Sequence, residues 1–121
     1  MELDGARISR VEAELDGRSH IAIALELPNA CVVFISEGGL RMGTLAIAMP
    51  PGGTPPSPGS TSAVVMGERL AFLARLLAER LASLTGKIAL LSLWAEGREA
   101  DVGRRAVEML KKLLEVNRDE P

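Results

Sequence analysis

The sequence predicts a single α+β domain, residues 1–121, in which two helices pack on a mostly antiparallel sheet of six strands. In the first half of the chain, apolar and polar residues alternate over short runs separated by turn-forming residues, which is typical of strands in hairpins. In the second half, apolar residues recur every three or four positions in two stretches, which is typical of amphipathic helices. The chain has 121 residues, 47% of them hydrophobic, which suffices for one buried core.

Four strands are expected in the first half, over residues 7–15, 20–27, 31–36 and 40–49. Asp16-Gly17 separates the first two and accepts the positive φ angles of a tight hairpin turn. Pro28-Asn29 and Glu37-Gly38-Gly39 supply the next two turns. Because short turns join antiparallel neighbours, we expect the four strands to form a meander.

A long loop is expected over residues 50–60. Five of the seven prolines lie between Pro50 and Pro58, mixed with glycines. Proline lacks the backbone N–H and interrupts both helices and central strands. Because the chain is strongly patterned on both sides, we interpret the segment as a mobile loop within the domain rather than a domain boundary. Loops of this length are commonly either functional or disordered, and the sequence leaves both possibilities open.

The second half is expected to run strand, helix, strand, helix, over residues 62–66, 68–84, 87–94 and 101–116. The first helix has a narrow apolar stripe and ends before Gly86, a residue that favours the left-handed conformation at helix C-termini. Asp101 is suited to the N-cap or the first turn of the second helix, where a carboxylate is favoured.

The strands around residues 31–36 and 87–94 are apolar on both faces, whereas each helix has only one apolar stripe. If both helices cover the same face of the sheet, the other face is apolar and exposed, and burying it favours a dimer. If one helix covers each face, no partner is needed. We expect the dimer, with an interface formed by Val33, Ile35, Leu91 and Leu93.

No catalytic or cofactor site is predicted. His20 is the only histidine, is expected at the surface, and points away from the adjacent Ser19, since neighbouring strand residues face opposite sides. Cys31 lies in an apolar run, which indicates an inert packed thiol. The chain has neither a cluster of metal ligands nor a phosphate-binding loop motif. Trp94 fits either the core or an exposed binding anchor, and we assign it to the core.

Composition excludes several other classes of function. The net charge is −2 and the basic residues are scattered, which argues against nucleic acid as a partner. No apolar run is long enough to span a membrane, and no signal peptide is recognised, so a cytoplasmic protein is expected. The absence of glutamine and the abundance of Arg and Glu are typical of a thermophile.

Two motifs carry a family resemblance. Gly39-Leu40-Arg41-Met42-Gly43-Thr44-Leu45 precedes the Pro-rich loop, and Ala63-Val64-Val65-Met66-Gly67 follows it and leads into the long helix. The order and spacing of these motifs resemble those of the small proteasome-assembly chaperones, over residues 7–116. The likeness is to the third and fourth members of that chaperone set, and in particular to the third. Together with the composition, the likeness suggests an archaeal relative.

The resemblance implies a protein without a cofactor that dimerises through its sheet, with itself or with a paralogue, and binds proteasome α-type subunits during ring assembly. It places client binding at residues Arg41, Met42, Gly43, Thr44, Pro51, Gly52, Gly53, Thr54, Pro55, Pro56 and Ser57. A glycine inside a strand also permits close backbone approach, although ordinary packing is the commoner role of such a segment. The alternatives are a roadblock-like regulatory scaffold, which usually opens with a helix, a small-ligand-binding module, and, ranked last, an enzyme.

Overall fold

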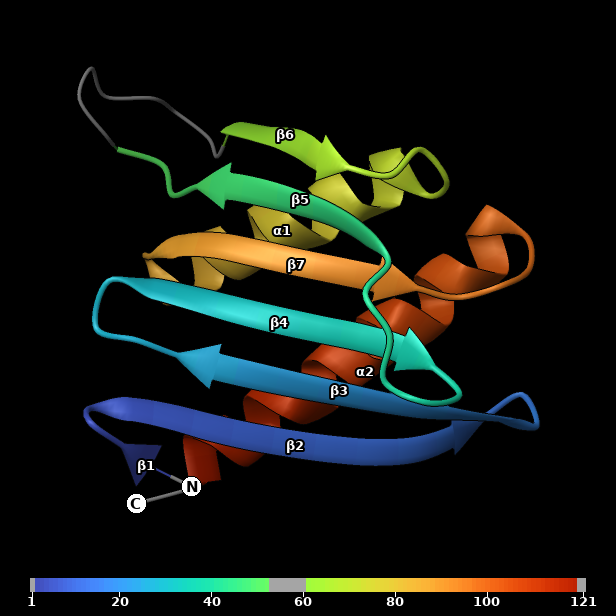
Figure 1. Ribbon diagram of the computed structural model, residues 1–121, viewed down its shortest axis with the longest axis horizontal. Coiled ribbons are helices and arrows are strands. Elements are labelled where there is room, and N and C mark those ends of the chain that lie inside the picture. The colour runs from blue at the N-terminus through green and yellow to red at the C-terminus, as the bar shows by residue number, and fades with distance from the viewer. Residues whose placement is uncertain (1, 53–60, 120–121) are drawn as a thin grey trace.

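The computed structural model describes residues 2–52 and 61–119 and shows one mixed sheet with two helices (Figure 1). The strands lie in the order β1-β2-β3-β4-β7-β5-β6. Their bounds are β1 (Glu2–Leu3), β2 (Ala6–Leu15), β3 (Arg18–Glu26), β4 (Ala30–Glu37), β5 (Thr44–Met49), β6 (Thr61–Met66) and β7 (Ile88–Trp94). The helices are α1 (Ala71–Thr85) and α2 (Glu99–Asp119). The predicted α+β class, with a mostly antiparallel sheet and two helices, is confirmed; β1 adds a two-residue edge strand.

The order of the central strands differs from the prediction. Strands β2, β3 and β4 form an antiparallel meander, but β5 does not pair with β4. Strand β7 lies between them, parallel to β4 and antiparallel to β5. The predicted four-strand meander is therefore wrong at its last step. The reason is that residues 38–43 do not form a hairpin; they cross in front of β4 and β7 to reach β5 (Figure 1).

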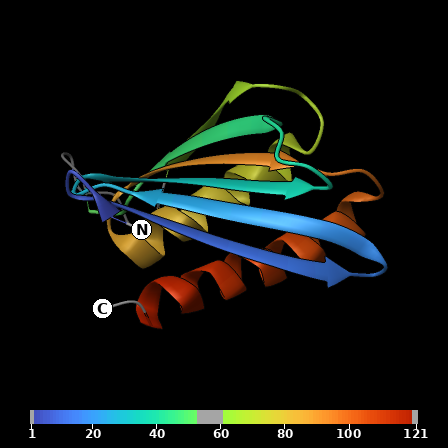
Figure 2. The same ribbon diagram turned by 60° about the horizontal axis from the view of Figure 1, so that its bottom comes forward.

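Both helices lie on the same face of the sheet (Figure 2). Helix α1 packs beneath β5, β6 and β7, and α2 packs beneath β2 and β3. Alanines line the sheet where the helices approach it, and larger side chains fill the space between them. This core includes Ala22, Ala24, Ala46, Ala48, Ala89, Leu81, Met109 and Leu113. The face away from the helices, called here the open face, has no helical layer within residues 2–52 and 61–119.

The four residues predicted to form a dimer interface lie in this core. Val33, Ile35, Leu91 and Leu93 are at most 2% exposed and face the helices. Because successive strand residues point to opposite faces, the open face is instead formed by their neighbours on the same strands, such as Leu90. The interface prediction therefore named the wrong side of β4 and β7.

Candidate functional site

The segment that crosses the open face, residues 38–43, is called here the crossing segment. Two buried serines hold it against the sheet. The hydroxyl of Ser36 donates to the carbonyl of Gly39 (2.6 Å) and accepts the N–H of Arg41 (3.2 Å). The hydroxyl of Ser92 accepts the N–H of Gly43 (2.8 Å). Ser36 and Ser92 are 0% and 1% exposed, and these hydrogen bonds satisfy hydroxyls that would otherwise be costly to bury.

Gly43 lies directly on the backbone of β7. A Cβ atom at this position would be 2.0 Å from the carbonyl oxygen of Leu93. Only glycine allows so close an approach of two backbones. The sequence favoured ordinary packing for this segment, whereas the structure places Gly43 in a close backbone approach.

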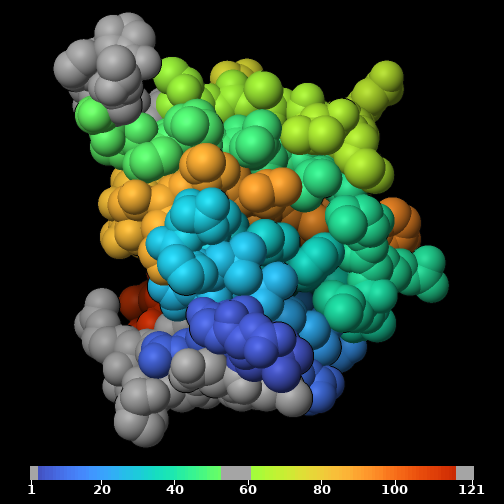
Figure 3. Space-filling view, turned by 60° about the vertical axis from the view of Figure 1, so that its left-hand side comes forward, coloured from blue at the N-terminus to red at the C-terminus, as the bar shows by residue number. Residues whose placement is uncertain are grey.

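The crossing segment stands out from the open face (Figure 3) and exposes large side chains. Leu40 and Met42 are about half exposed, and Trp94, where β7 ends, is 37% exposed. The guanidinium of Arg41 lies over the indole ring of Trp94, 5.5 Å from its centroid, in a cation–π contact. The assignment of Trp94 to the core is therefore wrong, because β7 carries this residue to the end of the sheet.

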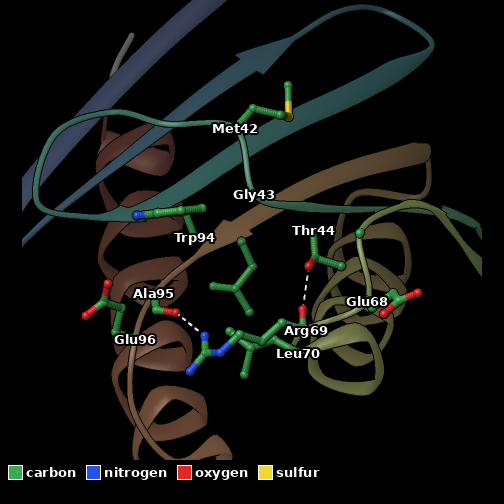
Figure 4. Close-up of a pocket in the computed structure, with 11 residues that line it drawn as sticks. Met42, Gly43, Thr44, Glu68, Arg69, Leu70, Trp94, Ala95 and Glu96 are labelled. Atoms are coloured by element: carbon green, nitrogen blue, oxygen red, sulfur yellow. Dashed lines mark hydrogen bonds between the residues drawn. The ribbon is translucent and has the colours of Figure 1, made fainter.

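A pocket of about 610 Å³ opens beside the crossing segment (Figure 4). It lies between the start of β5, the turn before α1 and the turn after β7. Its apolar lining comes from Met42, Leu70, Leu93, Trp94 and Ala95. Three segments that are distant in the sequence thus meet at one concave surface.

Arg69 ties two of these segments together. Its guanidinium donates to the carbonyl of Ala95 and to that of Gly97 (2.7 Å). The hydroxyl of Thr44 donates to the carbonyl of Arg69, which joins the start of β5 to the same turn (Figure 4). Leu70, the next residue, has a left-handed backbone with φ of 63°, so α1 begins at Ala71 rather than at the predicted residue 68. A non-glycine residue in this conformation is strained, and such strain is concentrated at functional sites.

A second group of residues, with charged side chains, also holds the turn after β7. Arg18 donates to Glu37 (2.8 Å), and the N–H of Glu96 donates to the second oxygen of that carboxylate (3.1 Å). Burial disfavours the ionised form of Glu37, but these donors outweigh it, so the pKa of Glu37 lies below its usual value. Arg105, almost fully buried, donates to the carbonyl of Glu96 (3.2 Å).

The two nucleophile and base candidates lie inside the fold. Cys31 is buried, as predicted, and burial raises the pKa of its thiol to about 11. His20 is only 4% exposed, so its predicted surface position is wrong. Its Nδ1 lies 2.9 Å from the carbonyl of Arg18, and α2 packs over the ring, which explains the burial. In residues 2–52 and 61–119, no three or more His, Cys, Asp or Glu side chains form a group able to hold a metal ion.

The open face carries an apolar row that runs across six strands. The strand register places Ile8, Leu25, Val32, Leu90, Ile47 and Ala63 side by side. The first five are half-buried and Ala63 is exposed, although neither helix of the described residues covers them. The condition stated from the sequence, two helices on one face and an apolar second face, is therefore met.

The residues predicted to bind a partner separate into two groups. Arg41, Met42, Gly43 and Thr44 lie together at the pocket and on the crossing segment. Pro51 and Gly52 follow the opposite end of β5, and the predicted residues Gly53, Thr54, Pro55, Pro56 and Ser57 lie outside the described residues. Leu70 and Trp94 also line the pocket, although Leu70 was not predicted as a site residue and Trp94 was predicted to lie in the core. The signal available for Trp94 was its position at the end of an apolar run, directly before a polar turn.

The fold is shared with a chain of a yeast chaperone complex for proteasome assembly. A chain in the crystal structure of a chaperone complex for yeast 20S proteasome assembly matches this one with a TM-score of 0.63 and 10% identity. The match covers 92% of this chain and 95% of the yeast chain. No protein-family model matches the sequence, and no curated protein gives a match. At this identity the likeness concerns the arrangement of strands and helices along almost the whole of both chains.

In the described part of the chain, neither helix is long and apolar enough to cross a membrane.

Proposed function

We propose that the protein is a non-enzymatic proteasome-assembly chaperone that dimerises through its open face and binds proteasome α-type subunits. The observation that carries the proposal is the apolar row on a sheet face that neither α1 nor α2 covers. The shared fold with a chain of the yeast chaperone complex supports the assignment to proteasome assembly. A roadblock-like scaffold is less well supported, because the match to a chain of the yeast chaperone complex extends over almost the whole of both chains.

The dimer follows from the physics of the open face. Removing apolar surface from water is favourable in proportion to its area. Stable interfaces bury about 800 Å² on each partner. A second sheet laid on the row around Leu90 would bury both apolar faces at once, as the two sheets of a sandwich do. The crossing segment covers the far end of the same strands, so the partner would lie on the part of the face toward the start of β4 and β7.

Size-exclusion chromatography with light scattering tests this interface. The expected mass of the wild-type protein is twice the chain mass of 12.8 kDa. Leu90→Lys places a charge in the middle of the apolar row and should shift the protein to the monomer. Val107→Lys is the matched control, because Val107 is 44% exposed on α2, on the opposite side of the molecule. A wild-type monomer, or a dimer that tolerates Leu90→Lys, would contradict the proposed interface. Mixing with a paralogue, followed by the same measurement, separates homodimers from mixed pairs.

Isothermal titration against purified proteasome α-type subunits tests the client. We expect saturable binding to at least one α-type subunit and none to β-type subunits, which serve as the control. Deletion of residues 51–59, with the ends rejoined, should weaken that binding and leave the circular dichroism spectrum unchanged, since the loop is proposed to take part in client binding. If none of the α-type subunits binds, the proposed function is wrong.

A further inference from the structure

The guanidinium of Arg69 lies at the pocket beside the crossing segment. Its side chain extends from the turn before α1 toward the turn after β7, where it donates to the carbonyls of Ala95 and Gly97 (Figure 4). Carbonyl groups accept hydrogen bonds but carry no net charge. In the described part of the chain no carboxylate forms an ion pair with Arg69, whereas Arg18 beside it is paired with Glu37. The positive charge of Arg69 is therefore not compensated.

Apolar side chains surround this cation. Met42, Leu70, Leu93 and Trp94 line the same pocket, whose volume of about 610 Å³ lies within the range of small-ligand pockets. Arg69 is itself exposed, so a ligand that enters the pocket can reach the guanidinium. A ligand that satisfies this lining needs an apolar group to cover the side chains and an anionic group to pair with Arg69.

The two carboxylates at the pocket do not supply that anionic group. Those of Glu68 and Glu96 point outward on opposite sides of the pocket (Figure 4). Both residues are exposed, and the high dielectric constant of water weakens their effect on a charge inside the pocket. The place beside the guanidinium is left to a ligand.

We infer that this pocket binds a carboxylate joined to a small apolar group, the chemistry shared by a free organic acid and the C-terminal residue of a polypeptide. The planar guanidinium of Arg69 matches the geometry of a carboxylate, and hydrogen bonds between two charged groups are stronger than those between neutral groups. The apolar group would lie on Met42, Leu70 and the indole of Trp94. The inference goes beyond the proposed function, because it concerns neither the dimer nor the α-type subunit.

The cation is held in place before a ligand binds. The carbonyl of Arg69 accepts the hydroxyl of Thr44, and two N–H groups of its guanidinium meet the carbonyls named above. Arginine has further N–H groups, which remain for a carboxylate. A side chain fixed in this way loses less conformational freedom on binding than a mobile one.

Trp94 provides a direct measurement, since it is the only tryptophan and the chain has no tyrosine. The probes are N-acetyl-leucine and N-acetyl-leucinamide, titrated at millimolar concentrations while the fluorescence of Trp94 is followed. The two share the apolar group, and only the acid carries the charge. We expect saturable binding that is tighter for the acid and weakens as salt is raised. Equal affinity for the acid and the amide would overturn the inference.

Variants of Arg69 test the role of the charge. Arg69→Gln should weaken binding of the acid about twofold to fivefold, as expected for an exposed charge pair, and leave binding of the amide unchanged. A variant that merely loosened the turn would weaken both probes, so the ratio of the two affinities is the quantity to compare. Arg69→Lys keeps the charge and should keep a preference for the acid. Arg80→Gln is the matched control, because Arg80 is exposed farther along α1. The same ratio in Arg69→Gln and Arg80→Gln would overturn the inference.

Glu96→Gln gives an independent test, because it leaves Arg69 in place and removes a negative charge at the edge of the pocket. Its preference for the acid over the amide should equal or exceed that of the wild type. A lowered preference would mean that the pocket does not select an anion, and the inference would be wrong.

The tripeptide acetyl-Ala-Ala-Leu, with a free C-terminus or as its amide, separates the two sources of the carboxylate. Tighter binding of the tripeptide acid than of N-acetyl-leucine assigns the site to a chain end, and equal or weaker binding assigns it to a free acid. Failure of both acids to bind overturns the inference. This result is independent of the chaperone function, which stands or falls with the titration against α-type subunits.

Discussion

Gly43 rests on the carbonyl group of Leu93, with no space between them for a methyl group. This contact is where the chain leaves the open face and enters β5. It fixes the position of the crossing segment relative to β7, and with it the positions of Arg41 and Met42.

Gly43→Ala is expected to destabilise the protein by about 1–3 kcal/mol, the range found for overpacked sites, because the crossing segment must move away from β7. Urea unfolding followed by circular dichroism measures the change. Gly39→Ala is the matched control in the same segment, since a Cβ atom there would meet nothing within 4 Å. If the two variants have the same free energy of unfolding, the crossing segment can move away from β7 at Gly43 without destabilising the protein, and the prediction is wrong.

Ser92→Ala removes the acceptor of the Gly43 N–H and leaves that group without its partner. The expected cost is about 1–3 kcal/mol, as for other buried donors that lose their acceptor. The measurement is hydrogen exchange at the Gly43 amide by NMR, which should become faster in the variant. Ser19→Ala, at an exposed position in the first hairpin, should leave this exchange rate as in the wild type.

Cys31 is expected to be unreactive in the folded protein. With a pKa of about 11, roughly one thiol in a thousand is ionised at pH 8, and the side chain is 1% exposed. Dithionitrobenzoate should therefore label the native protein very slowly at pH 8 and label one thiol per chain promptly in guanidinium chloride. Rapid labelling without denaturant would contradict the packing of β4 against β3 and β7.

Glu37 should make the protein sensitive to acid. Its pKa is lower in the folded protein than the ordinary value of 4.5, so its contribution to stability is fully present above that value and is lost as the pH falls through the lowered pKa. Between pH 6 and pH 3 the thermal midpoint of Glu37→Gln should therefore fall less steeply than that of the wild type. Glu115→Gln should follow the wild-type curve, and a Glu37→Gln curve parallel to the wild type would contradict the assignment.

The local elements were predictable because their signals lie within a few residues. The Asp16-Gly17 turn and the alternation of β3 appear where the sequence places them. Of the leucines at helical spacing, Leu73, Leu77 and Leu81 are buried on α1, whereas Leu70 precedes the helix and Leu84 is exposed. Gly86 adopts the left-handed conformation after α1, and its N–H donates to the carbonyl of Ala82, as its position predicted.

The order of the strands was not predictable in the same way. The residues Glu37-Gly38-Gly39 are typical of a hairpin turn. In the structure the chain instead continues across the sheet, and β7 pairs with β4 in the position that a hairpin would have given to β5. The parallel pairing of Val33 with Leu91 joins residues that are far apart in the chain, so no local pattern specifies it. The apolar character of both faces of β4 and β7 was the available signal, because it is typical of strands at the centre of a sheet.

The sequence by itself determined the α+β class, the alternation of the strands and the presence of more apolar sheet surface than two helices can cover. These features depend on the order of apolar, polar and turn-forming residues along the chain, which the sequence gives directly. Only the tertiary structure decided which alternate residues face the helices, where the crossing segment lies, and that Trp94 borders a pocket. The physical reason is that each of these depends on contacts between segments that meet only after β7 has entered the sheet between β4 and β5.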